Sequence, residues 1–417
     1  MDDPTEKYYQ ALIDAENDGE KLFEAKLVYS KKCIPDLNFW RSWFSGEEFS
    51  TEGDFQAKID IFNEALSMCP TEELALMYLD FLSKCVEDDL LKEEEYRTGF
   101  EKAVSACGMD IMTGGKVWKK LQEFELEEYQ DLLEVQSNPD TLRRAKARLI
   151  NVYTRQLSLP SIHGDDALRA FEQVMEEVCT EADLSLVQPS SLDKKVLKAR
   201  EEREARMVFE THLSSNKYTN SSTLDEKINS WQAYIKFEMS AGHLSRAQRL
   251  FERCLLDPAC KRVLSLWLQY SEWCLTTIKN FPLLGLIARR AVRLFPANTS
   301  LWRTRIMAFE RGDTGDAEGP EDLYNEVLVA TYSAGFVEAG DYLEMLLMGC
   351  DLQAWSLYDT SNRSSSRTGS SSSSSSGDGD DSTGGLGHPT ADAMRQAFAA
   401  AESFLESYYP QWMEGTQ

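Results

Sequence analysis

The sequence predicts an all-α protein: an α-solenoid of about nine helical hairpins forming a right-handed superhelix. Three observations support this fold class. One hairpin can be recognised in detail between Trp231 and Leu255. Its two core blocks recur along the chain, mostly at intervals of roughly 33 to 42 residues. A single hairpin of this kind cannot bury both of its apolar stripes unless copies stack beside it.

The best-defined hairpin consists of two amphipathic helices and a tight turn. In the first helix Trp231, Tyr234 and Phe237 recur at every third residue, so their rings cover one face. Gly242 can leave the helix with a positive φ, and we expect Ser245 to cap the second helix. The second helix carries an apolar stripe with the spacing of a buried face. Its members are Ala247, Leu250, Phe251, Cys254 and Leu255.

The core block of the second helix, in most copies an aliphatic residue followed by an aromatic one, recurs in order along the chain. Its copies are Val28-Tyr29, Ile61-Phe62, Phe100, Val152-Tyr153, Val208-Phe209, Leu250-Phe251, Ile287-Ala288, Leu323-Tyr324 and Ala397-Phe398. Aromatic stripes at helical spacing are usually core, so we interpret them as anchors of the repeats and not as a ligand cage. The anchors are Trp40, Trp118, Phe124, Trp231, Tyr234, Phe237, Phe251, Trp267, Tyr270, Trp302 and Tyr324.

The repeats predict five segments. Residues 1–160 hold the N-terminal hairpins, 161–226 a degenerate repeat with a long charged helix, and 227–358 the central hairpins. Residues 359–391 are rich in Ser, Gly and Asp and are expected to be disordered, because they cannot bury apolar surface. Residues 392–417 are the last helix of an array that we expect to be truncated, since no polar capping repeat is evident.

The composition restricts the classes of function. The 417 residues carry a net charge of −26, which disfavours non-specific binding to nucleic-acid backbones and favours basic partners. Nine Cys without any C-x-x-C pair indicate a reduced, intracellular protein with buried thiols. The sequence contains no run of 18 apolar residues, so it predicts no membrane span.

No constellation of residues predicts chemistry. The four His lie far apart and form no zinc-binding motif, so no metal ligands are assigned. Neither a phosphate-binding G-x-x-x-x-G-K-[ST] nor a nucleophilic G-x-S-x-G occurs, and no catalytic or cofactor-binding residue is predicted. Glu125, Glu238 and Glu310 recur near the end of first helices. We expect them to pair with an arginine of the second helix, such as Arg253.

Two basic stretches stand out in this acidic chain. One, from Arg143 to Arg148, opens a helix, and the other lies in the long charged helix. Both fit solvated helix faces, and both are also the candidate surfaces for docking a partner. The candidate docking residues are Arg143, Arg144, Lys146, Arg148, Arg200, Arg203 and Arg206.

The pairing of W-x-x-Y-x-x-F-E with A-x-x-L-F-E-R-x-L resembles the HAT (half-a-TPR) repeat of RNA-processing factors. Segments 233–255, 266–273, 290–313 and 333–346 resemble the family of the squamous cell carcinoma antigen recognised by T cells, whose members recycle the U4/U6 spliceosomal particle. This resemblance implies a nuclear, non-enzymatic scaffold in pre-mRNA splicing. The partners that it implies are U4/U6 particle components and ubiquitin-specific proteases.

The resemblance leaves several points open. In that family RNA is bound by C-terminal RNA recognition motifs, which this sequence lacks, so we expect its RNA contacts to be mostly indirect. The later HAT repeats that carry dimerisation and protease docking are also missing, which puts both activities in doubt. One alternative is a HAT scaffold of ribosomal RNA processing or mRNA 3′-end processing. Another is a helical-repeat enzyme subunit, which only Trp302-x-x-Arg305 favours.

Overall fold

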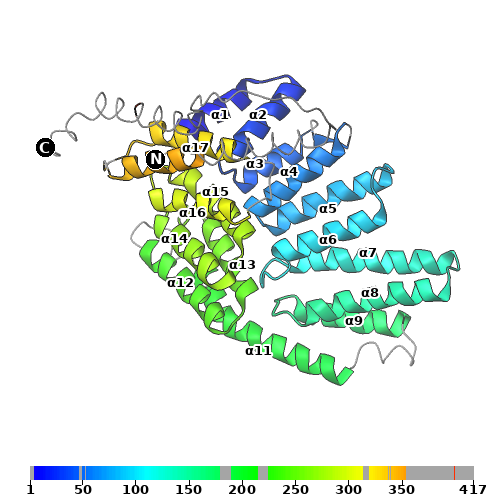
Figure 1. Ribbon diagram of the computed structural model, residues 1–417. Coiled ribbons are helices and arrows are strands. Elements are labelled where there is room, and N and C mark those ends of the chain that lie inside the picture. Colours follow the sequence, from blue (N-terminus) through cyan, green and yellow to red (C-terminus); the bar gives the residue numbers. More distant parts are fainter. Residues whose placement is uncertain are drawn as a thin grey trace, which may run out of the picture. The chain divides into compact units, whose positions relative to one another are not determined.

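A computed structural model of the chain describes residues 4–46, 49–51, 53–178, 189–214, 224–312, 319–336, 338, 340–353 and 399. Every regular element among these residues is helical (Figure 1), which confirms the predicted all-α class. The chain divides into two compact units, Met1–Val263 and Leu264–Gln417. Within the described ranges, no helix is long and apolar enough to cross a membrane.

The first unit is a succession of helices in which neighbours in the chain pack together, most extensively α5 with α6, α7 with α8 and α12 with α13. Figure 1 shows α5 to α8 lying side by side. The helices are α1 (Pro4–Ala15), α2 (Gly19–Lys32), α3 (Leu37–Phe44), α4 (Phe55–Met68), α5 (Glu72–Glu87), α6 (Glu93–Cys107), α7 (Gly115–Glu134), α8 (Pro139–Leu157), α9 (Gly164–Val178), α11 (Pro189–Ser214), α12 (Leu224–Ser240) and α13 (Leu244–Leu256).

The second unit continues the same pattern. Its α14 (Leu264–Trp273) passes into a π-helical turn at Cys274–Ile278, which ends at Lys279 in the left-handed region. It is followed by α15 (Phe281–Leu294), α16 (Thr299–Glu310), α17 (Pro320–Ser333) and a helical stretch over residues 340–353. Helices α15 and α16 pack closely along each other.

The predicted second-helix blocks fall on every second helix of this series. The first eight lie on α2, α4, α6, α8, α11, α13, α15 and α17, and the ninth, Ala397-Phe398, lies outside the described residues. Two of the aliphatic members are not core residues: Val28 is 41% exposed and Val208 is 71% exposed. Adjacent residues on a helix point about 100° apart, so an aromatic residue can face the core while its neighbour faces solvent.

The hydrophobic core of the first unit runs from one hairpin to the next. Trp40 of α3, Phe62 of α4, Tyr78 of α5 and Phe100 of α6 are almost fully buried members of one cluster that extends to Trp118 of α7. A second cluster covers α8, α9 and the start of α11. Burying one large apolar side chain contributes about 1.5–3 kcal/mol. Each helix thus gains stability from both of its neighbours in the chain, as expected for stacked hairpins.

Side-chain caps determine where many of these helices begin. The carboxylates of Asp36 and Asp54 and the hydroxyl of Thr71 accept hydrogen bonds from the third backbone N–H of α3, α4 and α5. Gly242 has the predicted positive φ, +75°. The prediction that Ser245 caps α13 is wrong. The helix begins at Leu244, two residues earlier than a cap at Ser245 requires, so its N-cap is His243, whose side chain makes no capping hydrogen bond.

The boundaries predicted for the five segments stay predictions. The long charged helix is α11, which covers residues 189–214 within the degenerate repeat. Apart from residue 399, the predicted disordered insertion (359–391) and the predicted last helix (392–417) lie outside the described residues.

Candidate functional site

The candidate docking residues on α8 lie partly on the surface. Arg143 and Arg144 are exposed, and in the described part of the chain Arg144 donates to the backbone carbonyl oxygen of Asp140. The ammonium group of Lys146 lies 5.8 Å from the ring centre of Tyr129. Arg148 is half-buried and turns towards α7. Of this stretch, Arg143 and Arg144 therefore offer the most accessible positive charge.

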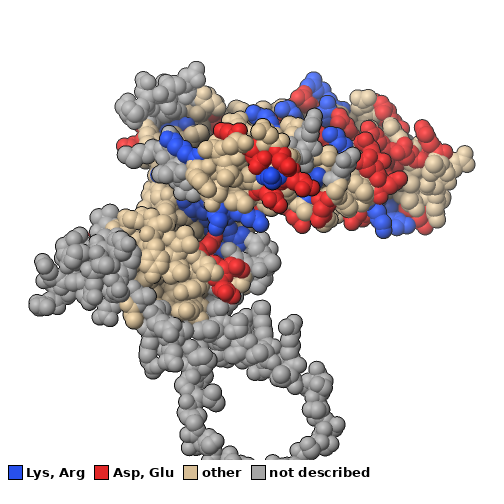
Figure 2. Space-filling model, turned by 90° about the horizontal axis from the view of Figure 1, so that it is seen from above, with Lys and Arg blue, Asp and Glu red and all other residues tan. Residues whose placement is uncertain are grey.

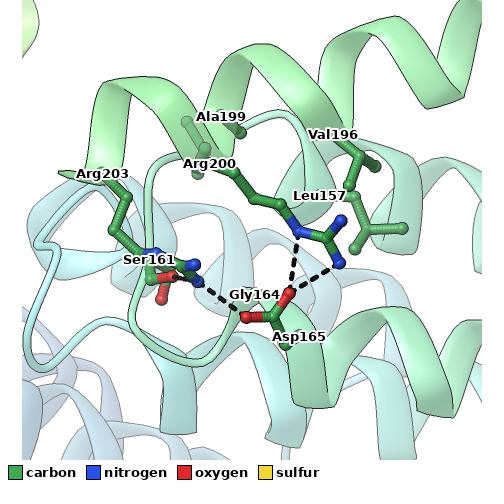
Figure 3. A pocket seen from close by; sticks show the side chains of 9 residues that line it. Leu157, Ser161, Gly164, Asp165, Val196, Ala199, Arg200 and Arg203 are labelled. Atoms are coloured by element: carbon green, nitrogen blue, oxygen red, sulfur yellow. Dashed lines mark hydrogen bonds and ion pairs between the residues drawn. The ribbon is translucent and has the colours of Figure 1, made fainter.

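The candidate docking residues on α11 are engaged within the first unit. Asp165, at the start of α9, lies between Arg200 and Arg203 (Figure 3). Its Oδ1 accepts from Arg200 Nε at 2.9 Å and its Oδ2 from Arg203 Nη1 at 3.0 Å. These two guanidinium groups lower the pKa of the Asp165 carboxyl. Both arginines hold α11 against α9.

Arg206, the third candidate on α11, is buried. Its side chain is 2% exposed, and that of its partner Glu238 on α12 is 1% exposed. The pair is bidentate: Nε and Nη2 of Arg206 lie 2.5 and 2.7 Å from the two carboxylate oxygens. The prediction that Glu238 pairs with Arg253 is therefore wrong. The contact crosses from one hairpin to the preceding one, which the spacing within a single hairpin could not indicate.

Glu125 on α7 occupies the position that corresponds to Glu238. Its two carboxylate oxygens accept from Arg97 Nε on α6 at 2.7 Å and from Arg148 Nε on α8 at 3.1 Å. Arg148 lies on the second helix of the same hairpin, where an arginine partner was expected, and Arg97 is a second partner in the preceding hairpin. Arg97 and Arg206 correspond because each stands three residues before the core aromatic residue of its helix.

A second kind of ion pair also occurs twice. On α13, Arg253 donates to both carboxylate oxygens of Glu210 on α11, at 2.7 and 2.9 Å. On α8, Arg155 donates to both carboxylate oxygens of Glu101 on α6, at 2.6 and 2.8 Å. Each glutamate directly follows the core aromatic residue of one second helix, and each arginine lies two residues past that of the next second helix. These pairs connect successive second helices.

The same arginines stack on aromatic rings of the first helices. The guanidinium of Arg155 lies 5.2 Å from the ring centre of Trp118, and that of Arg253 lies 5.5 Å from Trp231. At this distance a guanidinium is attracted by the ring face. We define two ion-pair sets from these contacts. The first set is Arg97, Glu101, Glu125 and Arg155 on α6 to α8, and the second set is Arg206, Glu210, Glu238 and Arg253 on α11 to α13.

The predicted repeat anchors lie in the core or at its edge. Most of them are buried, and Phe124, Phe237 and Tyr324 are half-buried. Phe124 and Phe237 lie under the guanidinium groups of Arg97 and Arg206, at 5.2 and 5.4 Å from the ring centres. The anchors thus have two functions in the fold: they fill the core and they carry the arginines that connect the repeats.

Two features of the described residues bear on reaction chemistry: the side chains that could ligate a metal and the cysteine thiols. In the described part of the chain, no group of three or more His, Cys, Asp or Glu side chains could hold a metal ion. The eight described cysteines are buried free thiols. Burial raises the pKa of Cys85 and Cys274 to about 11 and that of Cys107 to about 12, which keeps these thiols protonated and unreactive.

Comparison with known proteins places this architecture in a sequence family. The chain matches the family model of the PRP39 N-terminal HAT repeat over residues 6–173 and that of the PRP39 C-terminal HAT repeat over residues 204–338. The two matches are consecutive and cover most of the described helices. They agree with the resemblance to HAT repeats in the sequence.

Two kinds of curated relatives are similar to the chain. The spliceosome associated factor 3, U4/U6 recycling protein of Mus musculus is 28% identical over 256 residues, which is 60% of this chain and 23% of the relative. The protein of that name from Homo sapiens is 26% identical over 344 residues, 80% of this chain and 31% of the relative. Pre-mRNA-processing factor 39 of Danio rerio is 22% identical over 309 residues, 64% and 40% of the two chains. The chain thus spans less than half the length of each of these relatives.

Proposed function

This chain belongs to the HAT-repeat proteins, and on that premise we propose that it is a non-enzymatic scaffold in pre-mRNA splicing that acts in assembly and recycling of the U4/U6 particle. The observation that carries the proposal is the pair of consecutive HAT matches, over residues 6–173 and 204–338. The names of the relatives, a U4/U6 recycling protein and a pre-mRNA-processing factor, support the splicing assignment. The same names favour a nuclear location.

The acidic surface of the chain favours the binding of basic protein partners. The net charge is −26, and Figure 2 shows broad areas of Asp and Glu with smaller groups of Lys and Arg. Exposed carboxylates are dense at the turn from α5 to α6. They are Glu87, Asp88, Asp89, Glu93, Glu94 and Glu95. These carboxylates repel the phosphates of RNA because both groups are negatively charged. We therefore propose that proteins with basic segments bind here and that RNA is contacted mostly through those proteins.

The exposed arginines of α8 remain candidates for a separate contact. Arg143 and Arg144 lack a carboxylate partner within the described ranges and would suit an acidic segment of a partner. Among the partners we propose U4/U6 particle components and ubiquitin-specific proteases, on the strength of the family resemblance. Homodimerisation is left open by the sequence.

Affinity capture of the tagged chain from nuclear extract tests the proposal. Sequencing of the recovered RNA should show U4 and U6 RNA enriched over ribosomal RNA precursors, and mass spectrometry should show proteins of the U4/U6 particle. Enrichment of ribosomal RNA precursors, or of the 3′-end processing machinery, would instead support one of the alternative HAT scaffolds.

Direct RNA binding separates the scaffold from an RNA-binding protein. In a gel-shift assay at physiological salt, we expect the isolated chain to bind U6 RNA only weakly, since its net charge opposes association. The control is the double variant Arg143→Glu and Arg144→Glu, which should leave this weak binding nearly unchanged. A submicromolar affinity that the double variant abolishes would contradict the proposal of indirect RNA contacts.

A further inference from the structure

One arginine of α13 has no counterpart on α8. Arg249 stands two residues before the core residue Phe251, and the matching position before Tyr153 is occupied by Asn151. The neighbouring Arg246 and Arg253 do have counterparts on α8, which are Arg148 and Arg155. Arg253 and Arg155 form the ion pair with a second-helix glutamate that both regions share. Arg249 is therefore an additional charge that these ion pairs do not require.

The guanidinium of Arg249 is buried without adequate acceptors. Its side chain is 10% exposed, and its Nε and Nη1 atoms are buried with no hydrogen-bond partner in the described part of the chain. Oδ2 of Asp110 lies 3.8 Å from Arg249 Nε, beyond the range of a hydrogen bond. Burial lowers the pKa of Arg249, and Asp110 opposes this shift. Donors buried in this way normally meet an acceptor.

Asp110 is largely committed to other groups. The same Oδ2 atom lies 3.1 Å from Arg253 Nε. Its Oδ1 atom accepts from the backbone N–H groups of Met112 and Thr113, each at 3.0 Å. These contacts fix the carboxylate in the turn before α7. Asp110 therefore cannot approach Arg249 without giving up a closer partner.

Arg249 lines a small hollow that is partly open to solvent. The hollow lies between the turn at Met109–Ile111 and helices α12 and α13, and the charged groups that line it include Asp110, Glu238 and Arg246 as well as Arg249 and Arg253. Its space corresponds to roughly one water molecule. Arg246 donates to Glu202 and Arg253 to Glu210, while Glu238 accepts from Arg206. Of the arginines in this lining, Arg249 is therefore the one without a hydrogen-bonded carboxylate in the described part of the chain. One oxygen of a small anionic group that reaches in from solvent would match this space and could accept from Arg249.

We propose that this hollow is a binding subsite for one carboxylate group of a protein partner, which Arg249 receives through its unused N–H groups. A carboxylate is small and carries one negative charge, and its hydrogen bonds to a guanidinium are charge-assisted. A phosphate dianion would fit less well, because the carboxylates of Asp110 and Glu238 face the same space. The inference concerns the chemistry of the group that binds, and it is independent of the assignment to splicing.

Nuclear magnetic resonance of the full chain, labelled with ¹⁵N in arginine, tests the subsite with acetate as the probe. The Nε–H signal of Arg249 is identified by its absence from the spectrum of Arg249→Asn. Acetate should shift this signal and saturate it when acetate replaces chloride at constant ionic strength, while the signal of Arg155 stays in place. An Arg249 signal that does not move, or a shift shared by all arginines, would overturn the proposal.

Two variants separate binding from folding. Arg249→Asn installs the residue that α8 carries at this position, so it should keep the helical circular dichroism spectrum and the unfolding midpoint while acetate binding is lost. Asp110→Asn removes a competing negative charge while keeping an Oδ1 acceptor for the turn, and it should tighten acetate binding several-fold. Should Arg249→Asn fail to fold, Asp110→Asn decides alone: unchanged or weaker acetate binding would count against the subsite.

The source of the carboxylate is distinguished with two small probes. N-acetylglycine offers only a main-chain carboxylate, and the α-amide of N-acetylglutamic acid offers only a side-chain carboxylate. We expect at least one of them to bind as tightly as acetate, and the tighter one identifies whether a chain terminus or an acidic side chain enters the hollow. Inorganic phosphate binding more tightly than all three carboxylates would refute the assignment of a carboxylate subsite.

Discussion

The two ion-pair sets use the same residue types at the same repeat positions, yet the pair that connects successive second helices differs in its exposure to solvent. In the first set, Glu101 has a side chain that is 49% exposed. In the second set, the corresponding Glu210 is 2% exposed, and its partner Arg253 also contacts Asp110 from the turn before α7. The repeat pattern therefore specifies which side chains pair. The surroundings of each hairpin determine how much that pair contributes to stability.

This difference has a direct energetic consequence. An ion pair in contact with water contributes about 0–1 kcal/mol, because solvent screens the charges and two flexible side chains must be ordered. Removing one partner of a buried pair costs about 3–5 kcal/mol, because the remaining charge is left without water or a counter-ion. The Glu210–Arg253 pair should thus be far more sensitive to substitution than the Glu101–Arg155 pair.

The largest loss of stability is expected at a position that the two sets share, the tryptophan on which one arginine of each set stacks. Trp118→Ala and Trp231→Ala should each cost about 3–5 kcal/mol, from the cavity and the lost contacts. Trp118 should cost more by about 1 kcal/mol, because its Nε1 donates to the carbonyl oxygen of Gly108 at 2.9 Å. The indole nitrogen of Trp231 is buried with no hydrogen-bond partner among the described residues. Urea unfolding followed by circular dichroism measures both values.

Phenylalanine at the same positions isolates the hydrogen bond. Trp118→Phe should lose more stability than Trp231→Phe, since only the first substitution removes a paired donor. If the two phenylalanine variants were equally stable, the indole hydrogen bond to Gly108 would not contribute. Wild-type unfolding curves for either alanine variant would contradict the assignment of these residues to the core.

The next effect tests the difference between the two sets. Glu210→Ala should cost about 2–3 kcal/mol, somewhat below the range for a fully buried pair because Arg253 keeps Asp110 as a partner. Glu101→Ala is the matched variant in the first set and should cost about 0–1 kcal/mol. The measurement is the free energy of unfolding in urea at neutral pH. Equal costs would show that burial does not distinguish the two sets.

Most of the fold could be predicted from the sequence because the core pattern repeats. The spacing of aromatic and aliphatic residues placed the first eight second helices correctly. It could not say which member of an aliphatic–aromatic pair faces solvent, as with Val28 and Val208. The cap of α13 was missed because His243 starts the helix without a side-chain hydrogen bond, whereas Ser245 has the residue type that usually caps.

The candidate site was predicted less well, for a physical reason. Helix α11 carries charged residues on all of its faces. Its sequence therefore gives no indication that Arg206 faces the core, or that Arg200 pairs with Asp165 near the surface. The pairs of Arg97 and Arg206 cross from one hairpin to the next, and their partners lie 28 and 32 residues away. Aligning the repeats on their core aromatic residues would have exposed this pattern, since both arginines stand three residues before that residue.

The smallest effect is the pH dependence of the exposed pair in the first set. Hydrogen bonds from Arg155 lower the pKa of Glu101 from its ordinary value of 4.5. A carboxyl whose pKa is lower in the folded chain contributes stability above its unfolded pKa and loses it as the pH falls through the folded pKa. The stability advantage of wild type over Glu101→Gln should therefore be present at neutral pH and shrink below about pH 4.5.

Unfolding in urea at a series of pH values between about 7 and 3.5 measures this difference. The control is Glu127→Gln, which makes the same substitution at an exposed glutamate of α7 whose side chain forms no ion pair within the described ranges. A gap between wild type and Glu101→Gln that stays constant in acid would show that Arg155 holds Glu101 no more tightly in the folded chain than in the unfolded one. The contact between Glu101 and Arg155 would then add no stability, whereas the buried pair of Glu210 and Arg253 is expected to stabilise the fold.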